Sequence, residues 1–188
     1  MNAPPPLPRT GFVTVLGRIS LLLAVLVLAG SLLQAVFALL LSDDTVARFA
    51  AHPAMPPAGA WMLEQRRLLS LLGLALAVLF LASSWGLLRR LEWARWGFIG
   101  FLVASAALNF ASLPLAGQFF DGMVGMFPAE FLDTPDGREF LAQMKFNRAV
   151  SLATATLTSL AFAALHGYVA WKLCTPEVRA EFGRTGQD

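Results

Sequence analysis

Arg89-Arg90-Leu91-Glu92-Trp93-Ala94-Arg95-Trp96-Gly97 is a short polar segment between two long apolar stretches of the chain. Its three arginines and two tryptophans lie within nine residues, a combination typical of the positively charged side of a membrane–water interface. So short a connection requires its flanking helices to be antiparallel neighbours. We therefore predict that this 89–97 turn lies at a membrane surface, anchored there by Arg89, Arg90, Trp93, Arg95 and Trp96.

Composition and apolar runs together predict the fold class. The chain has 188 residues, of which 57% are hydrophobic and only 14% charged, whereas about a quarter would be charged in a soluble domain. Four apolar stretches, at about residues 19–41, 68–88, 97–115 and 149–171, are each long enough to cross a hydrocarbon core of about 30 Å. We predict an all-α integral membrane protein, built as a four-transmembrane-helix bundle.

Domain boundaries follow from these spans. Residues 1–18 read as a proline-rich N-terminal segment, residues 19–172 as the membrane domain, and residues 173–188 as a tail with a short helix. The first span is too long for the apolar core of a signal peptide, so we expect it to be retained.

Lysine and arginine counts orient the spans, because cytoplasmic ends carry an excess of these residues. The side that holds both termini and the 89–97 turn has eight of them, against six on the opposite side. We therefore expect both termini to be cytoplasmic. The alanine-, leucine- and arginine-rich composition favours a bacterial inner membrane. The eight are Arg9, Arg18, Arg89, Arg90, Arg95, Lys172, Arg179 and Arg184, and the six are Arg48, Arg66, Arg67, Arg138, Lys145 and Arg148.

Capping patterns predict short amphipathic helices in the outer loops. Ser42 precedes Asp43 and Asp44, and Thr134 precedes Pro135, so each can begin a helix. In the tail, Thr175-Pro176-Glu177 predicts a further helix ending at Gly183. Its Val178 and Phe182 are four residues apart, and we expect both to lie on the inner membrane surface.

The second outer loop carries a cluster of large apolar residues. One interpretation is an amphipathic segment lying in the membrane interface. The other is a docking surface for a protein partner, since clustered exposed apolar groups need covering. The candidate partner-binding residues are Phe119, Phe120, Met123, Phe127, Phe140 and Met144.

Polar residues inside the spans are the default candidates for function. Gln34 and Asn109 lie at similar depths and could hydrogen-bond across the bundle, as structural contacts or as a ligand site. His166 lies at the depth of Ser83 and Ser84, without the further ionisable groups that a proton relay needs.

Small residues in the spans predict helix-packing faces, because they let helices approach closely in lipid. These are Gly30, Ser31, Ala35, Gly73, Ala77, Ser84, Gly97, Gly100, Ala104, Ala163 and Gly167. A shift of 81 residues also pairs Arg67 with Arg148, Ser70 with Ser151 and Gly86 with Gly167, as either an internal duplication or convergent composition.

Motifs for catalysis, cofactors and nucleic acid are missing from the sequence. The single Cys174 excludes a disulfide within the chain, and the net charge of +2 is too small to argue for nucleic-acid binding. There is no nucleophile elbow, P-loop or zinc-binding helix. We therefore expect no cofactor and a non-enzymatic accessory or assembly subunit of a larger membrane complex. Its partners would be lipids and either another membrane protein or a second copy. The alternative is a small oligomeric transporter or lipid-binding protein, and an intramembrane enzyme is the weakest hypothesis.

Overall fold

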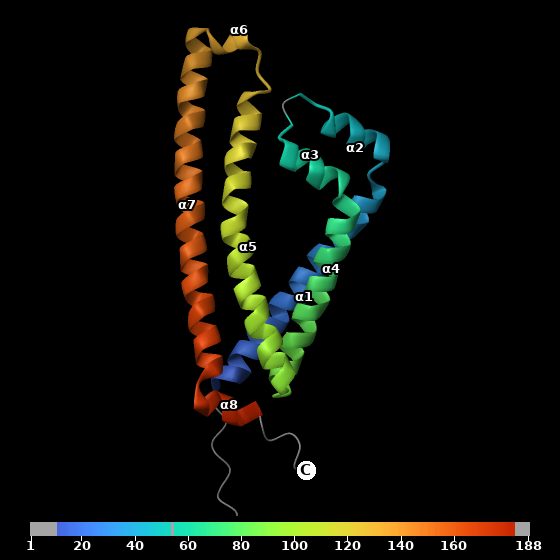
Figure 1. The fold of residues 1–188 in the computed structure, drawn as a ribbon, viewed down its shortest axis with the longest axis vertical. Helices are drawn as coiled ribbons and strands as arrows, with labels where there is room; N and C mark the ends of the chain where they lie inside the picture. The colour runs from blue at the N-terminus through green and yellow to red at the C-terminus, as the bar shows by residue number, and fades with distance from the viewer. Residues whose placement is uncertain (1–10, 54, 183–188) are drawn as a thin grey trace, which may run out of the picture.

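The computed structural model describes residues 11–53 and 55–182, and every regular element in this part of the chain is a helix (Figure 1). Residues 1–10, Gly183 and Arg184 lie outside the described residues, and with them Arg9 and most of the proline-rich segment. The helices in chain order are α1 (Gly11–Leu40), α2 (Asp43–Ala50), α3 (Pro57–Glu64), α4 (Arg66–Leu88), α5 (Glu92–Val124), α6 (Ala129–Leu132), α7 (Pro135–Cys174) and α8 (Pro176–Phe182).

Helices α1, α4, α5 and α7 are each long and apolar enough to cross a membrane, which indicates an integral membrane protein. Three of them exceed the spans expected from hydropathy. Helix α1 begins at Gly11 instead of residue 19. At the end opposite the 89–97 turn, α5 continues past residue 115 by about 13 Å, and α7 begins about 21 Å before residue 149. The α5–α7 pair therefore projects beyond the apolar zone.

The long helices form two antiparallel hairpins rather than a closed bundle. Helix α1 packs along α4 and α5 packs along α7, while α4 meets α5 next to the 89–97 turn. Figure 1 shows the hairpins converging at this turn end and diverging toward the opposite, loop end. Only 33% of the most apolar window of α4 and 6% of that of α7 are buried. In lipid, burial from water does not drive closure, so exposed apolar faces are tolerated.

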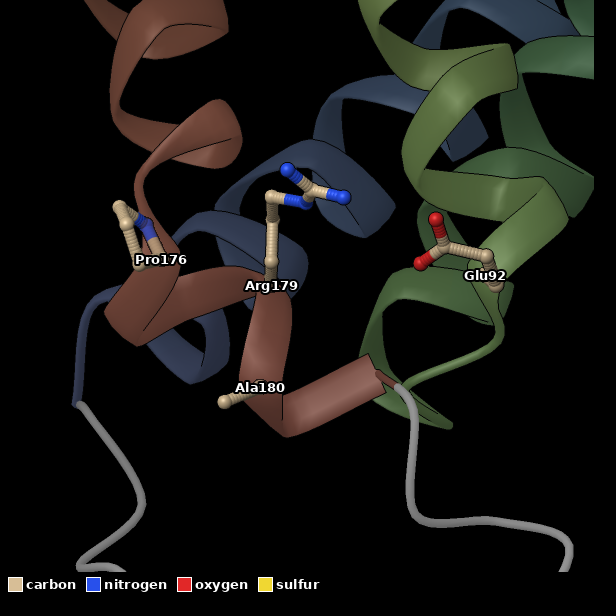
Figure 2. Close-up of a pocket in the computed structure, with 4 residues that line it drawn as sticks. All are labelled: Glu92, Pro176, Arg179 and Ala180. Atoms are coloured by element: carbon tan, nitrogen blue, oxygen red, sulfur yellow. The ribbon is translucent and has the colours of Figure 1, made fainter.

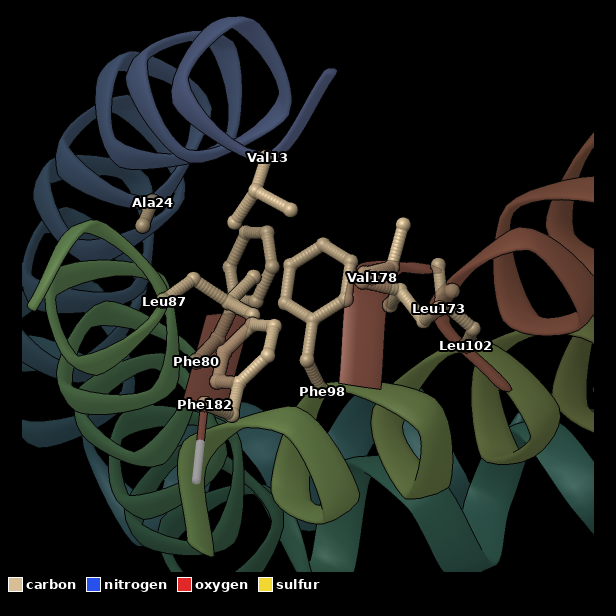
Figure 3. Packing of buried hydrophobic residues seen from close by; sticks show 9 residues of the cluster. All are labelled: Val13, Ala24, Phe80, Leu87, Phe98, Leu102, Leu173, Val178 and Phe182. Atoms are coloured by element: carbon tan, nitrogen blue, oxygen red, sulfur yellow. The ribbon is translucent and has the colours of Figure 1, made fainter. Parts of the chain in front are cut away.

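The apolar core lies at the turn end (Figure 3). Phe80 of α4 stacks on Phe98 and Phe101 of α5, with ring centroids 6.0 and 4.2 Å apart. Val178 and Phe182 of α8 are 0% and 2% exposed in this core, so the expectation that they lie on the membrane surface is wrong. Helix α8 folds back beneath the helices because its apolar side fills the space between the converging hairpins. The core residues are Val13, Ala24, Phe80, Leu87, Phe98, Leu102, Leu173, Val178 and Phe182.

Three of the helices begin at the positions that local sequence patterns predict. The Ser42 hydroxyl accepts a hydrogen bond from the Thr45 amide at the start of α2, and the Thr134 hydroxyl accepts one from Gly137 at 3.0 Å. Helix α8 follows Thr175, with Pro176 in its first turn. These predicted starts are confirmed. The start at Thr134 runs into one continuous helix, so Phe140–Met144 belongs to α7 and is not a separate interfacial segment.

Glycines of the long helices are of two kinds. A Cβ atom at Gly86 would lie 2.4 Å from the Cβ of Ala94, and one at Gly17 would lie 2.7 Å from Leu88 Cδ2, so these positions permit close packing at the turn end. By contrast, a Cβ atom at Gly30, Gly73, Gly100 or Gly167 would have no neighbour within 4 Å. The packing faces expected around Gly30, Gly100 and Gly167 are therefore uncovered in the single chain. The face expected from Gly73, Ala77 and Ser84 is covered in part, because Ala77 and Ser84 are buried.

Candidate functional site

A buried arginine joins three helices at the turn end. Arg90, directly after α4, has a φ of 59°, which aims its side chain back under the hairpins. Its Nε donates to Glu181 Oε2 of α8 at 2.9 Å, and its Nη2 donates to Thr14 Oγ1 of α1 at 2.9 Å. The side chains of Arg90 and Glu181 are only 12% and 8% exposed. The network ties α8 and the start of α1 to the turn.

Arg95 forms a second internal contact at this end. Its side chain is 2% exposed and pairs with Glu92, while Nη1 donates to the carbonyl oxygen of Leu173 in α7 at 3.3 Å. Its guanidinium lies 4.6 Å from the centre of the Trp96 ring. This arginine therefore ties the end of α7 to the start of α5 within the second hairpin.

The expected interface anchors thus fall into two groups. Arg90 and Arg95 make internal contacts, whereas Trp93 and Trp96 are 53% and 57% exposed, as an interfacial belt requires. Arg89 is exposed and lies over the Trp85 ring at 4.6 Å. Hydropathy alone could not separate the groups, because both contain the same residue types.

A shallow hollow of about 430 Å³ lies beside α8, lined by Glu92, Pro176, Arg179 and Ala180. Figure 2 shows Arg179 of α8 and Glu92 of α5 extending toward it from opposite sides. Glu92 is already paired with Arg95. The charge of Arg179 also acts on Glu92 across the hollow, which has no enclosed volume.

At the loop end, each hairpin is bridged by an aspartate and an arginine. Asp43 follows α1 and pairs with Arg66 and Arg67 at the start of α4. Asp121 of α5 pairs with Arg148 of α7 at 3.1 Å. Arg67 and Arg148 are the two arginines paired by the 81-residue shift. Arg67 contacts Asp43, the first residue of α2, and Arg148 contacts Asp121 near the end of α5.

The Asp43 pair is ionised at neutral pH. The hydrogen bond from Arg66, and then the charge of Arg67, hold the pKa of the Asp43 carboxyl below its usual value. A depressed folded-state pKa contributes stability that is present above the unfolded pKa and is lost as the pH falls through the folded one. The bridge therefore persists throughout the neutral range.

A larger cavity, of about 690 Å³, lies at the loop end between the hairpins. One wall is the α2–α3 connection and the start of α3, and the other is the loop-end part of α5. Like the hollow beside α8, this cavity is wide open and not enclosed. Its lining residues are Pro53, Met55, Pro56, Pro57, Ala58, Gln118, Asp121, Gly122 and Gly125. Sequence reasoning missed this site.

The candidate partner-binding residues are divided by the structure. Phe127 and Phe140 pack on each other, with ring centroids 4.6 Å apart, and both pack on Phe131, which sequence reasoning missed. Phe119 is 62% exposed. The half-buried residues are Phe120, Met123 and Met144. Phe119 is thus the best placed of the set to meet a partner, whereas Phe127 and Phe140 hold the α5–α7 tip together.

The intramembrane polar candidates are not gathered into one site. The Asn109 amide donates to the Ser105 carbonyl oxygen of its own helix at 3.1 Å. Gln34 is exposed on α1, in the other hairpin. His166 is half-buried next to Phe162, and its Nδ1 has no hydrogen-bond partner among the described residues.

Possible metal ligands are not clustered in the described part of the chain. Among residues 11–53 and 55–182, no group of three or more His, Cys, Asp or Glu side chains is arranged to hold a metal ion. The carboxylates that the structure brings to the hairpin ends face arginines instead. Comparison of the chain with protein-family models, curated proteins and solved structures finds no match.

Proposed function

We propose that this protein is a non-enzymatic accessory or assembly subunit of a larger membrane protein complex. The observation that carries the proposal is the small share of each long helix that the chain buries by itself, 33% at most and 6% at least in the apolar windows. The polar contacts serve to fix the hairpins: Arg90 and Arg95 at the turn end, Asp43 and Asp121 at the loop end. Hairpins fixed in this way would present the exposed apolar faces of their helices to a partner at a defined angle.

The open glycines indicate how a partner would pack. Gly100 of α5 and Gly167 of α7 lie on one hairpin and have space for a Cβ atom. A partner's transmembrane helix approaches most closely where the backbone is bare, and such contacts stabilise helix association in lipid. The projecting α5–α7 tip, with Phe119 exposed, supplies a second contact outside the apolar zone.

The test is purification from native membranes in mild detergent, with quantitative mass spectrometry of associated proteins. We expect a partner at fixed stoichiometry with the wild type, and at least a tenfold loss of it with Gly100→Leu or Gly167→Leu. Both substitutions add bulk where the single chain has room, so the thermal stability of the chain should not change. Val25→Leu, at an exposed position on α1 of the other hairpin, is the control.

A partner retained equally by all variants would contradict packing through these faces, and the absence of any stoichiometric protein would contradict the accessory role. A charged residue in place of Phe119 tests the contact at the α5–α7 tip by itself, because it leaves the helix faces around Gly100 and Gly167 unchanged. Phe127 is unsuitable for that purpose because its ring packs internally on Phe140.

We further propose that the membrane is a bacterial inner membrane and that the turn end is cytoplasmic. The positive charge at that end and the exposed Trp93 and Trp96 support this orientation. The native Cys174 tests it without mutation, because it is the only cysteine and it is exposed at the same end. A membrane-impermeant maleimide should label it in inverted vesicles and leave it unlabelled in intact spheroplasts. The reverse pattern would invert the topology.

Transport through a polar path is less well supported. Gln34 and Asn109, the polar residues expected to line such a path, lie on separate hairpins, and the Asn109 amide donates to a carbonyl oxygen of its own helix. They therefore form no shared polar lining.

A further inference from the structure

We propose that α3 is an interfacial helix whose Trp61 and Met62 insert into the lipid leaflet at the loop end, at the boundary between headgroups and acyl chains. This inference does not depend on the accessory role. It concerns a helix face that the chain itself leaves open, because Trp61 and Met62 are 54% and 47% exposed. The occupant of this face is the lipid surface, as the height, direction and residue pattern of α3 indicate.

The height of α3 in the membrane is set by its connection to α4. Helix α4 has 23 residues and is therefore about 35 Å long, close to the hydrocarbon thickness of about 30 Å. With the 89–97 turn at one membrane surface, Arg66 at the start of α4 lies at the other. Only Gln65 separates Arg66 from Glu64, the last residue of α3. Helix α3 is therefore held close to the level of the lipid headgroups.

The direction of α3 also suits an interface. Gln65 has a φ of −89° and a ψ of 12°, whereas helical values are about −63° and −42°, so the chain bends between α3 and α4. Figure 1 shows α3 lying across the direction of α4 instead of continuing along it. A helix in this orientation lies along the membrane surface, so its whole length stays within the interface.

Residue types around α3 match the two sides of such an interface. Its only charged residue is Glu64, at its last position. With 3.6 residues per turn, Met62 lies about 160° around the helix from Glu64. Met62 can therefore point into the acyl region while the Glu64 carboxylate stays among the headgroups. Trp61 lies between them, at the level that the amphipathic indole ring prefers.

The open face of α3 is continuous with a surface that lipid already covers. Helix α4 is long and apolar enough to cross the membrane, and its first turns carry Leu68 and Leu71, which are 52% and 63% exposed. The exposed apolar surface thus runs from α3 into the membrane-spanning part of the same hairpin. Lipid in contact with these leucines would reach Met62 and Trp61 without a gap.

The experiment measures the depth of nitroxide labels on the full chain in phosphatidylcholine vesicles. Depth follows from the rates at which each label collides with oxygen, which concentrates in hydrocarbon, and with a water-soluble nickel chelate. Single labels are attached to Trp61→Cys and to Met62→Cys in a Cys174→Ser background, which removes the only native cysteine. We expect oxygen to dominate at both positions, with the Met62 label about 5–10 Å below the membrane surface.

Three further labels calibrate the measurement. Leu72→Cys, at an exposed position of α4, supplies the value for hydrocarbon, and Glu130→Cys, in α6 at the projecting tip, supplies the value for water. Glu64→Cys is the matched control within α3, and its label should lie nearer to water than the Met62 label.

Two results would overturn the proposal. Nickel collision rates at both Trp61 and Met62 as high as at Glu130 would place α3 in water. Protection of both positions from oxygen and nickel alike would mean that protein, not lipid, covers this face. A hydrocarbon value at Leu72 in the same series would show that the chain still spans the membrane, so that the failure belongs to the interfacial role of α3 alone.

Discussion

Glu181→Ala is expected to detach α8 from the turn end and to lower the stability of the chain by about 3 kcal/mol. The substitution leaves the Arg90 guanidinium, only 12% exposed, without its carboxylate. Removal of one partner from a buried ion pair is strongly destabilising because the remaining charge is uncompensated. Loss of α8 would also expose Val178 and Phe182. Hydrogen exchange across residues 176–182 and thermal unfolding in detergent measure the two effects.

Glu177→Ala provides the matched control for this experiment. It makes the same chemical change in the same short helix, but the Glu177 side chain is 76% exposed and lies 3.8 Å from Lys172. Exposed pairs of this kind contribute about 0–1 kcal/mol. Equal effects of the two substitutions would mean that Arg90 does not hold α8 in place.

Gly86→Val is expected to force α4 and α5 apart at the turn and to lower stability by about 2 kcal/mol. The new Cβ would lie 2.4 Å from the Cβ of Ala94 and 3.2 Å from the Trp93 ring. Ala94 is completely buried, so it has no free space into which to move. The shift would carry Phe98 away from Phe80 and open the core. Thermal unfolding in detergent, with tryptophan fluorescence as a second signal, reports the change.

Gly73→Val separates this clash from the general effect of valine in a helix. Gly73 is in the same helix, and a Cβ atom there would have no neighbour within 4 Å. Its substitution should leave the unfolding temperature nearly unchanged in the isolated chain. If both variants were equally stable, the close approach of α4 and α5 would not be a constraint.

Local features of this fold could be read from the sequence, because they depend on neighbouring residues. The helix starts at Ser42 and Thr134 follow from side-chain capping of the next three residues. The long helices follow from uninterrupted apolar runs. The extension of α5 and α7 past those runs was missed, since hydropathy reports the apolar zone and not the end of the helix.

Contacts between distant residues could not be read in the same way. Arg90 and Glu181 are separated by 91 positions, and neither differs in type from the exposed charges around it. The pattern of Val178 and Phe182 revealed an apolar helix side, but the same side suits a membrane surface or a protein core. The loop-end cavity depends on where the α2–α3 connection meets α5, which no local signal specifies.

The two hairpins are joined at the turn end, so a change of the angle between them there would move their far ends apart or together. Helix α7 has 40 residues and is therefore about 60 Å long. A rotation of about 5° at the turn end would move the far tip of α7 by about 5 Å over this length. The turn end is held by the hydrogen bonds of Arg90 with Thr14 and Glu181. A small change in these contacts would produce a larger displacement at the loop end. A rotation at the turn end would therefore change the distance between the far tips of the two hairpins.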